Sequence, residues 1–324
     1  MRMTMTPPRP LASTAEAAKN LLLVDELQAI LRSSHQSGLG CVPLRGVALG
    51  EWLYGNPVAR PTGDIDLLVR REELDGMRTV LSALGFREVE PRPGAAVRYD
   101  YTLAFFKWHH LLVIAEPHWS LAYQPFLDRL DMAAVWRRCQ PAHVLGIPSY
   151  QLATEDLLLH LSLHYLHHRP GAPSFWLDEM DGLIRRDTLQ WSLLLATARE
   201  ARLGLLVATA LQAVRTHCHT PIPEEVMHAL SNGALPSSEA RLTRFLATSV
   251  MRGRERIATL LILPGWGAKL QYLLSYLFPS TAFIRLQYGV AGWRTGWIYL
   301  WRLASLSVAG LRGLWQVARH RCRR

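Results

Sequence analysis

The chain has 324 residues, of which 49% are hydrophobic and 19% are charged. This composition excludes a largely disordered protein, because it supplies enough apolar side chains for a core and little net charge per residue. The four cysteines stand far apart in a chain that can bury its own core, which excludes a disulfide scaffold and favours reduced thiols in the cytoplasm. The first ten residues are Pro-rich and lack the apolar core of a secretion signal.

The excess of basic residues that gives the net charge of +10 lies at the C-terminal end of the sequence. No Asp or Glu follows Glu255, whereas the last 69 residues contain ten Lys and Arg. Residues 1–255 carry 26 basic and 26 acidic side chains and are therefore neutral. An anionic partner of this protein would therefore meet the C-terminal segment.

The first 150 residues alternate between helical and strand-like patterns. The predicted elements, in chain order, are a helix at 14–32, a strand at 41–44, a helix at 47–54, a strand at 64–69, a helix at 72–84 and paired strands at 98–107 and 110–116. This succession predicts a small α/β or α+β sheet domain at 35–150, preceded by a tail and helix at 1–34.

From Thr154 onward the alternation typical of strands disappears. The predicted helices are 154–168, 175–186, 189–202, 204–217, 222–231 and 237–250. We therefore predict an α+β protein, in which a small mixed-sheet domain is followed by a helical C-terminal domain at 151–255. A basic, Trp- and Arg-rich helical extension covers 256–324.

Residues 286–319 contain a single apolar stripe at helical spacing. Its members are Trp293, Trp297, Leu300, Ala304, Val308, Leu311 and Trp315. A membrane span is not expected, since no window of about 20 residues here lacks Arg and Lys. Packing of this stripe on the helical domain is the favoured interpretation. The alternative is that the helix docks on an anionic membrane surface or on a protein partner.

Two acidic residues open the second predicted strand. Residues two apart on a strand point to the same face, so Asp64 and Asp66 project together while Ile65 and Leu67 enter the core. Adjacent carboxylates repel each other unless a cation lies between them, and hard oxygen ligands suit Mg²⁺. Two metals about 3.5–4 Å apart would serve a phosphoryl transfer. Glu116, at the end of a later apolar strand, is the candidate for the third carboxylate.

These motifs resemble the polymerase-β-like nucleotidyltransferase superfamily, and more closely a bacterial group described as uncharacterised nucleotidyltransferases. The resemblance covers about residues 20–300 and is most specific at 44–69. The residues that carry it are Arg45-Gly46 before Ala48-Leu49, Leu53-Tyr54, Arg60-Pro61, Asp64-Ile65-Asp66 and Glu116-Pro117-His118-Trp119. Val47 departs from the superfamily, which usually has Ser after the glycine.

The resemblance implies a two-metal Mg²⁺ enzyme that moves a nucleoside monophosphate from an NTP, such as ATP, to a hydroxyl or phosphate. Asp64 and Asp66 would then bind Mg²⁺, and Glu116 would complete the metal site and help deprotonate the acceptor. Gly46 would let backbone N–H groups approach the triphosphate. We add Arg45 and Arg60 as candidates for contacts to phosphate, with surface or interdomain ion pairs as the alternative.

The acceptor implied by the resemblance is a small molecule, a peptide natural product or a glycan precursor. The sequence leaves two alternatives open: a toxin-like enzyme that modifies tRNA or other RNA, which is less favoured, and a non-catalytic nucleotide-binding protein. The expected location is the cytoplasm, with peripheral association at the inner membrane face as an option.

Four histidines occupy the first predicted helix of the second half. His160, His164, His167 and His168 share one helical face, because they are spaced by about one or two turns. We interpret them as structural or nucleotide-contacting residues. A zinc site is the alternative, weakened by the lack of a matched cysteine.

Overall fold

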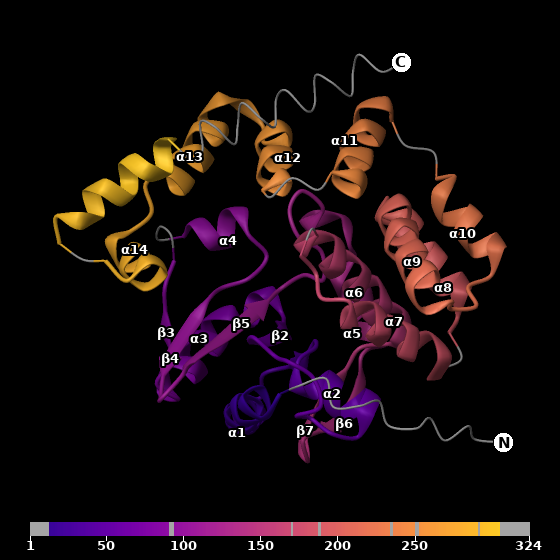
Figure 1. The fold of residues 1–324 in the computed structure, drawn as a ribbon, viewed down its shortest axis with the longest axis horizontal. Helices are drawn as coiled ribbons and strands as arrows, with labels where there is room; N and C mark the ends of the chain where they lie inside the picture. The colour runs from indigo at the N-terminus through magenta and orange to yellow at the C-terminus, as the bar shows by residue number, and fades with distance from the viewer. Residues whose placement is uncertain are drawn as a thin grey trace.

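The computed structural model describes residues 13–304 except 91–93, 170, 187–188, 234–235, 250–252 and 291. Its N-terminal half contains a five-stranded mixed sheet with the order β1-β2-β5-β4-β3 (Figure 1). The strands are β1 (Cys41–Pro43), β2 (Ile65–Val69), β3 (Arg87–Glu88), β4 (Phe105–Trp108) and β5 (Leu112–His118). β2 and β5 pair in parallel, and the other neighbours pair antiparallel.

The two faces of this sheet belong to two hydrophobic cores. Ile65, Leu67 and Val69 pack in a core with α1 (Thr14–Gln36) and α3 (Leu74–Ala83). Leu68, on the opposite face of β2, packs in the core of the helical half instead. The alternation of β2 therefore directs Asp66 away from α1 and toward the helical half.

The helical half is built around α6 (Thr154–His168), which packs against α7 (Phe175–Arg186), α8 (Trp191–Glu200) and α9 (Gly204–Cys218). It continues with α10 (Glu224–Ser231) and α11 (Ser237–Thr248). The predicted α+β class and the predicted helices of this half are confirmed, and α6 and α7 have the predicted bounds.

The sheet domain differs from the sequence-based prediction in several places, and the short strand β3 is one of the elements that were not predicted. The predicted strand at 98–107 is wrong at its start, because residues Ala95–Tyr99 form the short helix α4 and β4 begins only at Phe105. A hairpin of β6 (Gln140–Val144) and β7 (Ile147–Gln151) and the preceding helix α5 (Met132–Arg138) were not predicted. The two residues of the hairpin turn, Leu145 and Gly146, both have positive φ. Leu rarely adopts this conformation, so the sequence gives little indication of a tight turn here.

The extension consists of α12 (Arg254–Ile262), α13 (Gly265–Leu277), α14 (Thr281–Tyr288) and a final helical segment at 294–304. The prediction of one helix from 286 onward is wrong, because α14 ends at Tyr288 and Gly289 adopts a left-handed conformation. The part of that prediction at 305–319 lies outside the described residues. Among the helices that the structure describes, none is long and apolar enough to cross a membrane.

One titratable side chain lies in the middle of the α6 core. His160 is 3% exposed, and its Nδ1 lies 3.2 Å from the carbonyl oxygen of Leu121, to which it donates a hydrogen bond. Burial, together with the nearby Arg45 charge, lowers the pKa of His160 to about 3. The folded protein therefore keeps this imidazole neutral at pH values where the unfolded chain protonates it.

This difference predicts a loss of stability in mild acid. Below its ordinary pKa of about 6.5 the histidine takes up a proton only in the unfolded chain, so lowering the pH from 7 to 5 should cost about 2 kcal/mol through His160 alone. In His160→Gln, which can still donate to Leu121 but does not titrate, that share of the loss should vanish. Urea unfolding of both proteins at both pH values measures it. Equal losses in wild type and variant would show the assignment to be wrong.

Candidate active site

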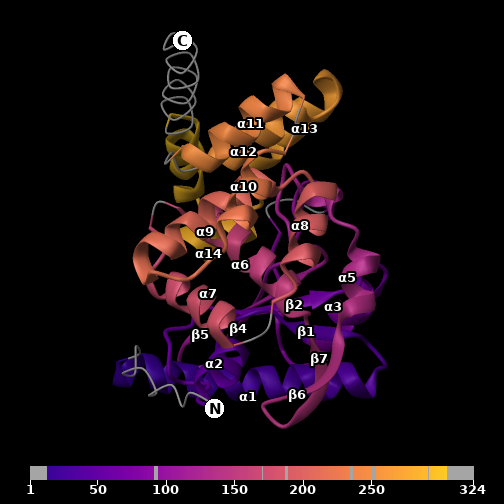
Figure 2. The same cartoon turned by 90° about the vertical axis from the view of Figure 1, so that its right-hand side faces the viewer.

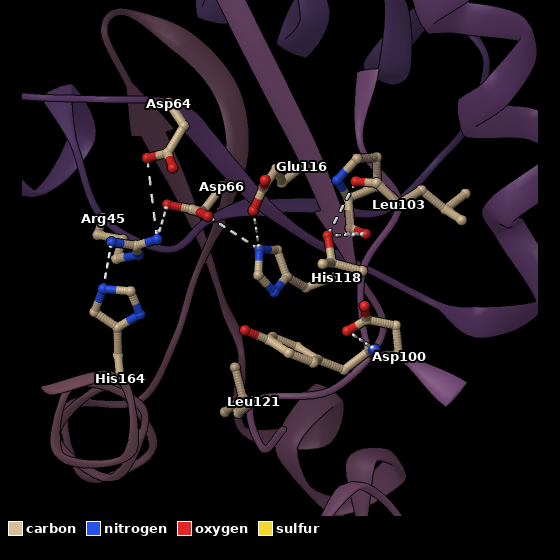
Figure 3. Close-up of polar contacts among 12 residues, drawn as sticks. Arg45, Asp64, Asp66, Asp100, Leu103, Glu116, His118, Leu121 and His164 are labelled. Atoms are coloured by element: carbon tan, nitrogen blue, oxygen red, sulfur yellow. Dashed lines mark hydrogen bonds and ion pairs between the residues drawn. The ribbon is translucent and has the colours of Figure 1, made fainter. Parts of the chain in front are cut away.

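The parallel pairing of β2 with β5 brings two predicted acidic residues together. Asp66 stands directly opposite Glu116 in the strand register. Asp64 precedes β2 by one residue, two positions before Asp66, and so its side chain projects on the same side of the strand. Figure 3 shows the three carboxylates facing a common space beside Arg45. The three residues predicted as catalytic and metal-binding therefore lie in one cluster.

Burial distinguishes the three carboxylates. The Asp66 side chain has no exposed surface, whereas Asp64 is 32% and Glu116 29% exposed. Burial and the charges of the two aspartates raise the pKa of Glu116 to about 8. Burial and the Asp66 charge likewise raise the pKa of Asp64. Crowding of the carboxylates thus favours the protonated form of Glu116 at neutral pH, and a cation beside the cluster would lower its pKa. Asp64 and Glu116, the two outer members, are open to solvent.

Arg45 supplies the compensating positive charge. It directly precedes Gly46 and α2 (Val47–Tyr54), and its Nη2 lies 2.7 Å from Oδ2 of Asp66 and 4.0 Å from Oδ1 of Asp64. Burial opposes ionisation of Asp66, but the Arg45 charge and a hydrogen bond from His118 outweigh it and hold the pKa of Asp66 well below its ordinary value. Asp66 is therefore an anion in the folded protein.

His118 is a member of the cluster whose role the sequence analysis did not assign. Its Nε2 lies 3.0 Å from Oδ1 of Asp66 and 3.9 Å from Oε2 of Glu116. Because an ionised carboxylate only accepts hydrogen bonds, Nε2–H of His118 is the donor. The signal was available: His118 follows Glu116 by two residues on the same strand, so both side chains point to one face.

The helical half reaches the cluster through His164 on α6. Its Nε2 lies 2.6 Å from Nη1 of Arg45, and its ring centroid lies 4.4 Å from that of Trp176 on α7. Arg always donates, so the imidazole accepts and is neutral. Burial and the Arg45 charge hold the pKa of His164 well below its ordinary value, in agreement with that assignment.

The other histidines of α6 lie in a stack of rings. His164 and His168 have ring centroids 4.4 Å apart, and His160 and His164 have centroids 6.0 Å apart. In the part of the chain that the structure describes, no group of three metal-ligand side chains includes a histidine of this helix. These contacts are those of structural residues, and His164 adds a contact to Arg45.

Gly46 has a conformation that requires glycine. Its φ is +67°, and a Cβ atom at this position would lie 3.0 Å from Cγ2 of Thr62 and 3.4 Å from the carbonyl oxygen of Asp64. Gly46 therefore brings the start of α2 close to the loop that carries Asp64. The first N–H groups of a helix lack partners within the helix and favour an anion.

Arg60, predicted to contact phosphate, is buried. Its Nε lies 2.6 Å from Oε1 of Glu179 on α7, and its guanidinium lies over the Phe175 ring at 5.0 Å from the centroid. This is an ion pair between the sheet domain and the helical half, the arrangement given as the alternative for Arg60.

The cluster fits a divalent cation. Polar atoms of Asp66, Glu116 and His118 all lie within 4.8 Å of one another. Because Nε2 of His118 carries the proton that it donates to Asp66, the ligand atoms that this group offers are the oxygens of the two carboxylates. Carboxylate oxygens are the hard ligands that Mg²⁺ and similar ions prefer. Asp64, the third predicted ligand, lies beside this group on the far side of Arg45 from His164 (Figure 3).

Three solved structures are similar to this chain at low sequence identity. The solution structure of the antibiotic-resistance factor ANT(2'')-Ia is 19% identical in sequence to this chain. The TM-score is 0.39, and the match covers 62% of this chain and 98% of that one. Its crystal structure in complex with adenylyl-2''-tobramycin matches with 18% identity and a TM-score of 0.37, over 59% and 98%. An antigenic nucleotidyltransferase-like protein from Paracoccidioides brasiliensis matches with 16% identity and a TM-score of 0.39, over 71% and 98%.

No curated protein matches the chain. The family model described as uncharacterised nucleotidyltransferase matches residues 11–218, which include the whole carboxylate cluster and the helix that carries His164. The match extends over more than half of the sequence and confirms the resemblance noted from the motifs. The chain is therefore a member of the uncharacterised nucleotidyltransferase family.

Proposed function

We propose that the protein transfers a nucleoside monophosphate from an NTP, such as ATP, to a hydroxyl or phosphate group of an acceptor, with Mg²⁺ bound at the carboxylate cluster. The observation that carries this proposal is the position of Asp66 opposite Glu116 on parallel strands, with Asp64 on the same side. Nucleotidyl transfer needs groups that position the triphosphate and offset its charge, and three adjacent carboxylates around a cation meet that need.

Asp64, Asp66 and Glu116 are the residues we propose for holding Mg²⁺. When bound, the metal would offset the charge that develops on the attacking and leaving oxygens. His118 holds the Asp66 carboxylate through Oδ1 and so orients it toward Glu116. Asp64 and Glu116 are the two members open to solvent, which supports a role for them on the side from which substrates enter.

Two further groups are proposed to handle protons and phosphate. With Mg²⁺ beside it, Glu116 would be ionised and could accept the proton of an acceptor hydroxyl, because its carboxylate is partly exposed and faces the other two. Arg45 and the N–H groups at the start of α2 are proposed to contact the triphosphate, since Gly46 allows close approach there. Arg60 is proposed to act at a distance, by fixing α7 against the sheet domain through Glu179.

The acceptor that we propose is a small molecule, a peptide natural product or a glycan precursor, as the family resemblance implies. An NTP-dependent reaction on such a precursor would take place in the cytoplasm. Val47, where the polymerase-β-like superfamily usually has Ser, would leave the phosphate contact at this position to the backbone N–H alone.

Loss of the aspartates tests the reaction directly. In Asp64→Asn/Asp66→Asn, pyrophosphate release from the four NTPs with Mg²⁺ and cell extract as the source of acceptor should fall by roughly 1,000-fold, because the charges that hold the metal are gone. Chelation of the metal should have the same effect on wild type.

The matched control for this experiment is Asp75→Asn, which removes a carboxylate that is 92% exposed on α3. This variant should release pyrophosphate at the wild-type rate. Release that survives in the folded double variant, or no release from wild type with any NTP and extract, would contradict the proposal.

His164 should affect the reaction through Arg45. His164→Ala removes the acceptor that fixes Nη1 of Arg45, and a hydrogen bond to a charged group of this kind is worth enough to lower kcat/KM for the NTP by about tenfold. His164→Gln, whose amide oxygen can accept the same bond, should retain most of the activity. Steady-state pyrophosphate assays measure both variants. Equal losses in the two would mean that ring packing, rather than the bond to Arg45, is what matters.

A further inference from the structure

The extension exposes an unusual concentration of tryptophan. The four tryptophans at 256–304 are all more than half exposed: Trp266 is 87%, Trp293 76%, Trp297 63% and Trp301 58% exposed. Soluble proteins do expose single apolar residues, but a run of large aromatic side chains on one helix face marks an interaction surface.

Two of these tryptophans share one face of the helix at 294–304, and a third precedes the helix directly. Trp293, Trp297 and Trp301 follow one another at intervals of four residues, and Leu300, 58% exposed, lies between them. We call these four residues the tryptophan face. The first members of the predicted apolar stripe are thus exposed, in contrast to the favoured interpretation that the stripe is packed.

The opposite side of the same helix fixes it to the rest of the extension. Tyr299 donates a hydrogen bond from its hydroxyl to the carbonyl oxygen of Pro279, at 2.6 Å. Arg302 is buried and donates to the hydroxyl of Tyr288 and the carbonyl oxygen of Tyr276, at 2.6 Å each. The helix is therefore anchored on one side, and this holds the tryptophan face outward.

The charged side chains of the described extension beyond Glu255 have one sign. The described part of the extension beyond Glu255 contains Lys and Arg but no Asp or Glu. Arg294 is exposed next to Trp293, with its guanidinium 5.9 Å from that ring, and Lys269 lies 5.7 Å from the Trp266 ring. Tryptophan flanked by basic side chains suits the boundary between water and lipid, where anionic headgroups pair with the cations.

From the exposed tryptophan face and the wholly basic charge of the extension, we propose that the extension docks on an anionic lipid surface, with the helix at 294–304 lying in the plane of the headgroups. Both views place the extension at the end of the molecule opposite α1 (Figures 1 and 2). The carboxylate cluster belongs to the sheet domain between these two ends, so the docked enzyme would keep its cluster above the membrane surface.

The test is partition of the full-length protein onto vesicles of phosphatidylglycerol and phosphatidylcholine, with pure phosphatidylcholine vesicles for comparison. Wild type should sediment with the anionic vesicles and much less with the neutral ones, and high ionic strength should weaken binding. Trp293→Gln/Trp297→Gln should lower the partition coefficient by roughly tenfold or more, because two large apolar side chains no longer enter the interface.

Matched controls distinguish binding through the tryptophan face from binding through any exposed tryptophan or arginine. Trp108→Gln removes a tryptophan that is 68% exposed on β4, and it should bind the vesicles as wild type does. Arg294→Glu should weaken binding, whereas Arg137→Glu, at a 70% exposed arginine on α5, should not.

Absence of binding to anionic vesicles would overturn the proposal, and so would equal binding by wild type and Trp293→Gln/Trp297→Gln. Two further measurements, light scattering and RNA binding, test whether the tryptophan face binds something other than lipid. A dimer that dissociates in the double variant, without vesicle binding, would assign the tryptophan face to a second copy of the chain. Binding of an RNA oligonucleotide in place of vesicles, lost in Arg294→Glu, would assign it to nucleic acid. None of these binding measurements depends on nucleotidyl transfer. Failure of this proposal can therefore be distinguished from failure of the proposed function.

Discussion

The arrangement of this site depends on one buried negative charge. Asp66 has no exposed side-chain surface, and an unpaired carboxylate in such a place would cost several kcal/mol. Arg45 stabilises this carboxylate by an ion pair and His118 by a hydrogen bond. His164 in turn fixes Arg45 by accepting a hydrogen bond from it. The need to stabilise one anion thus draws together the start of α2, strand β5 and helix α6. Without the helical half, Arg45 would keep its contacts to Asp66 and Asp64 but would lose the acceptor that fixes its Nη1.

Local patterns predicted the chemistry of the site, whereas contacts over long sequence distances did not follow from them. Alternation along β2 placed Asp64 and Asp66 on one side and Ile65 in the core, and the structure agrees. Glu116 was predicted as the third carboxylate because it ends the predicted apolar strand, although β5 continues to His118. The bond between Arg45 and His164 joins residues 119 apart, so no spacing rule reports it.

The fold, like the site, was predictable where a local sequence pattern determines an element. Long periodic helices such as α6 and α7 were located to the residue, because their apolar pattern repeats over several turns. The hairpin β6–β7 was missed because its turn residues are Leu145 and Gly146 rather than the usual Asn-Gly or Asp-Gly. The break at Gly289 was missed because the apolar stripe begins only at Trp293, so its spacing carries no information about the residues before it.

The ion pair between Arg60 and Glu179 has a consequence for how such chains diverge. Both side chains are almost fully buried, and each is the other's partner across the boundary between the sheet domain and α7. Replacement of either alone would leave a buried charge without compensation, while replacement of both by apolar residues of similar volume costs little. The two positions are therefore expected to change in concert among relatives, because the sheet domain and α7 each carry only half of a buried charge pair.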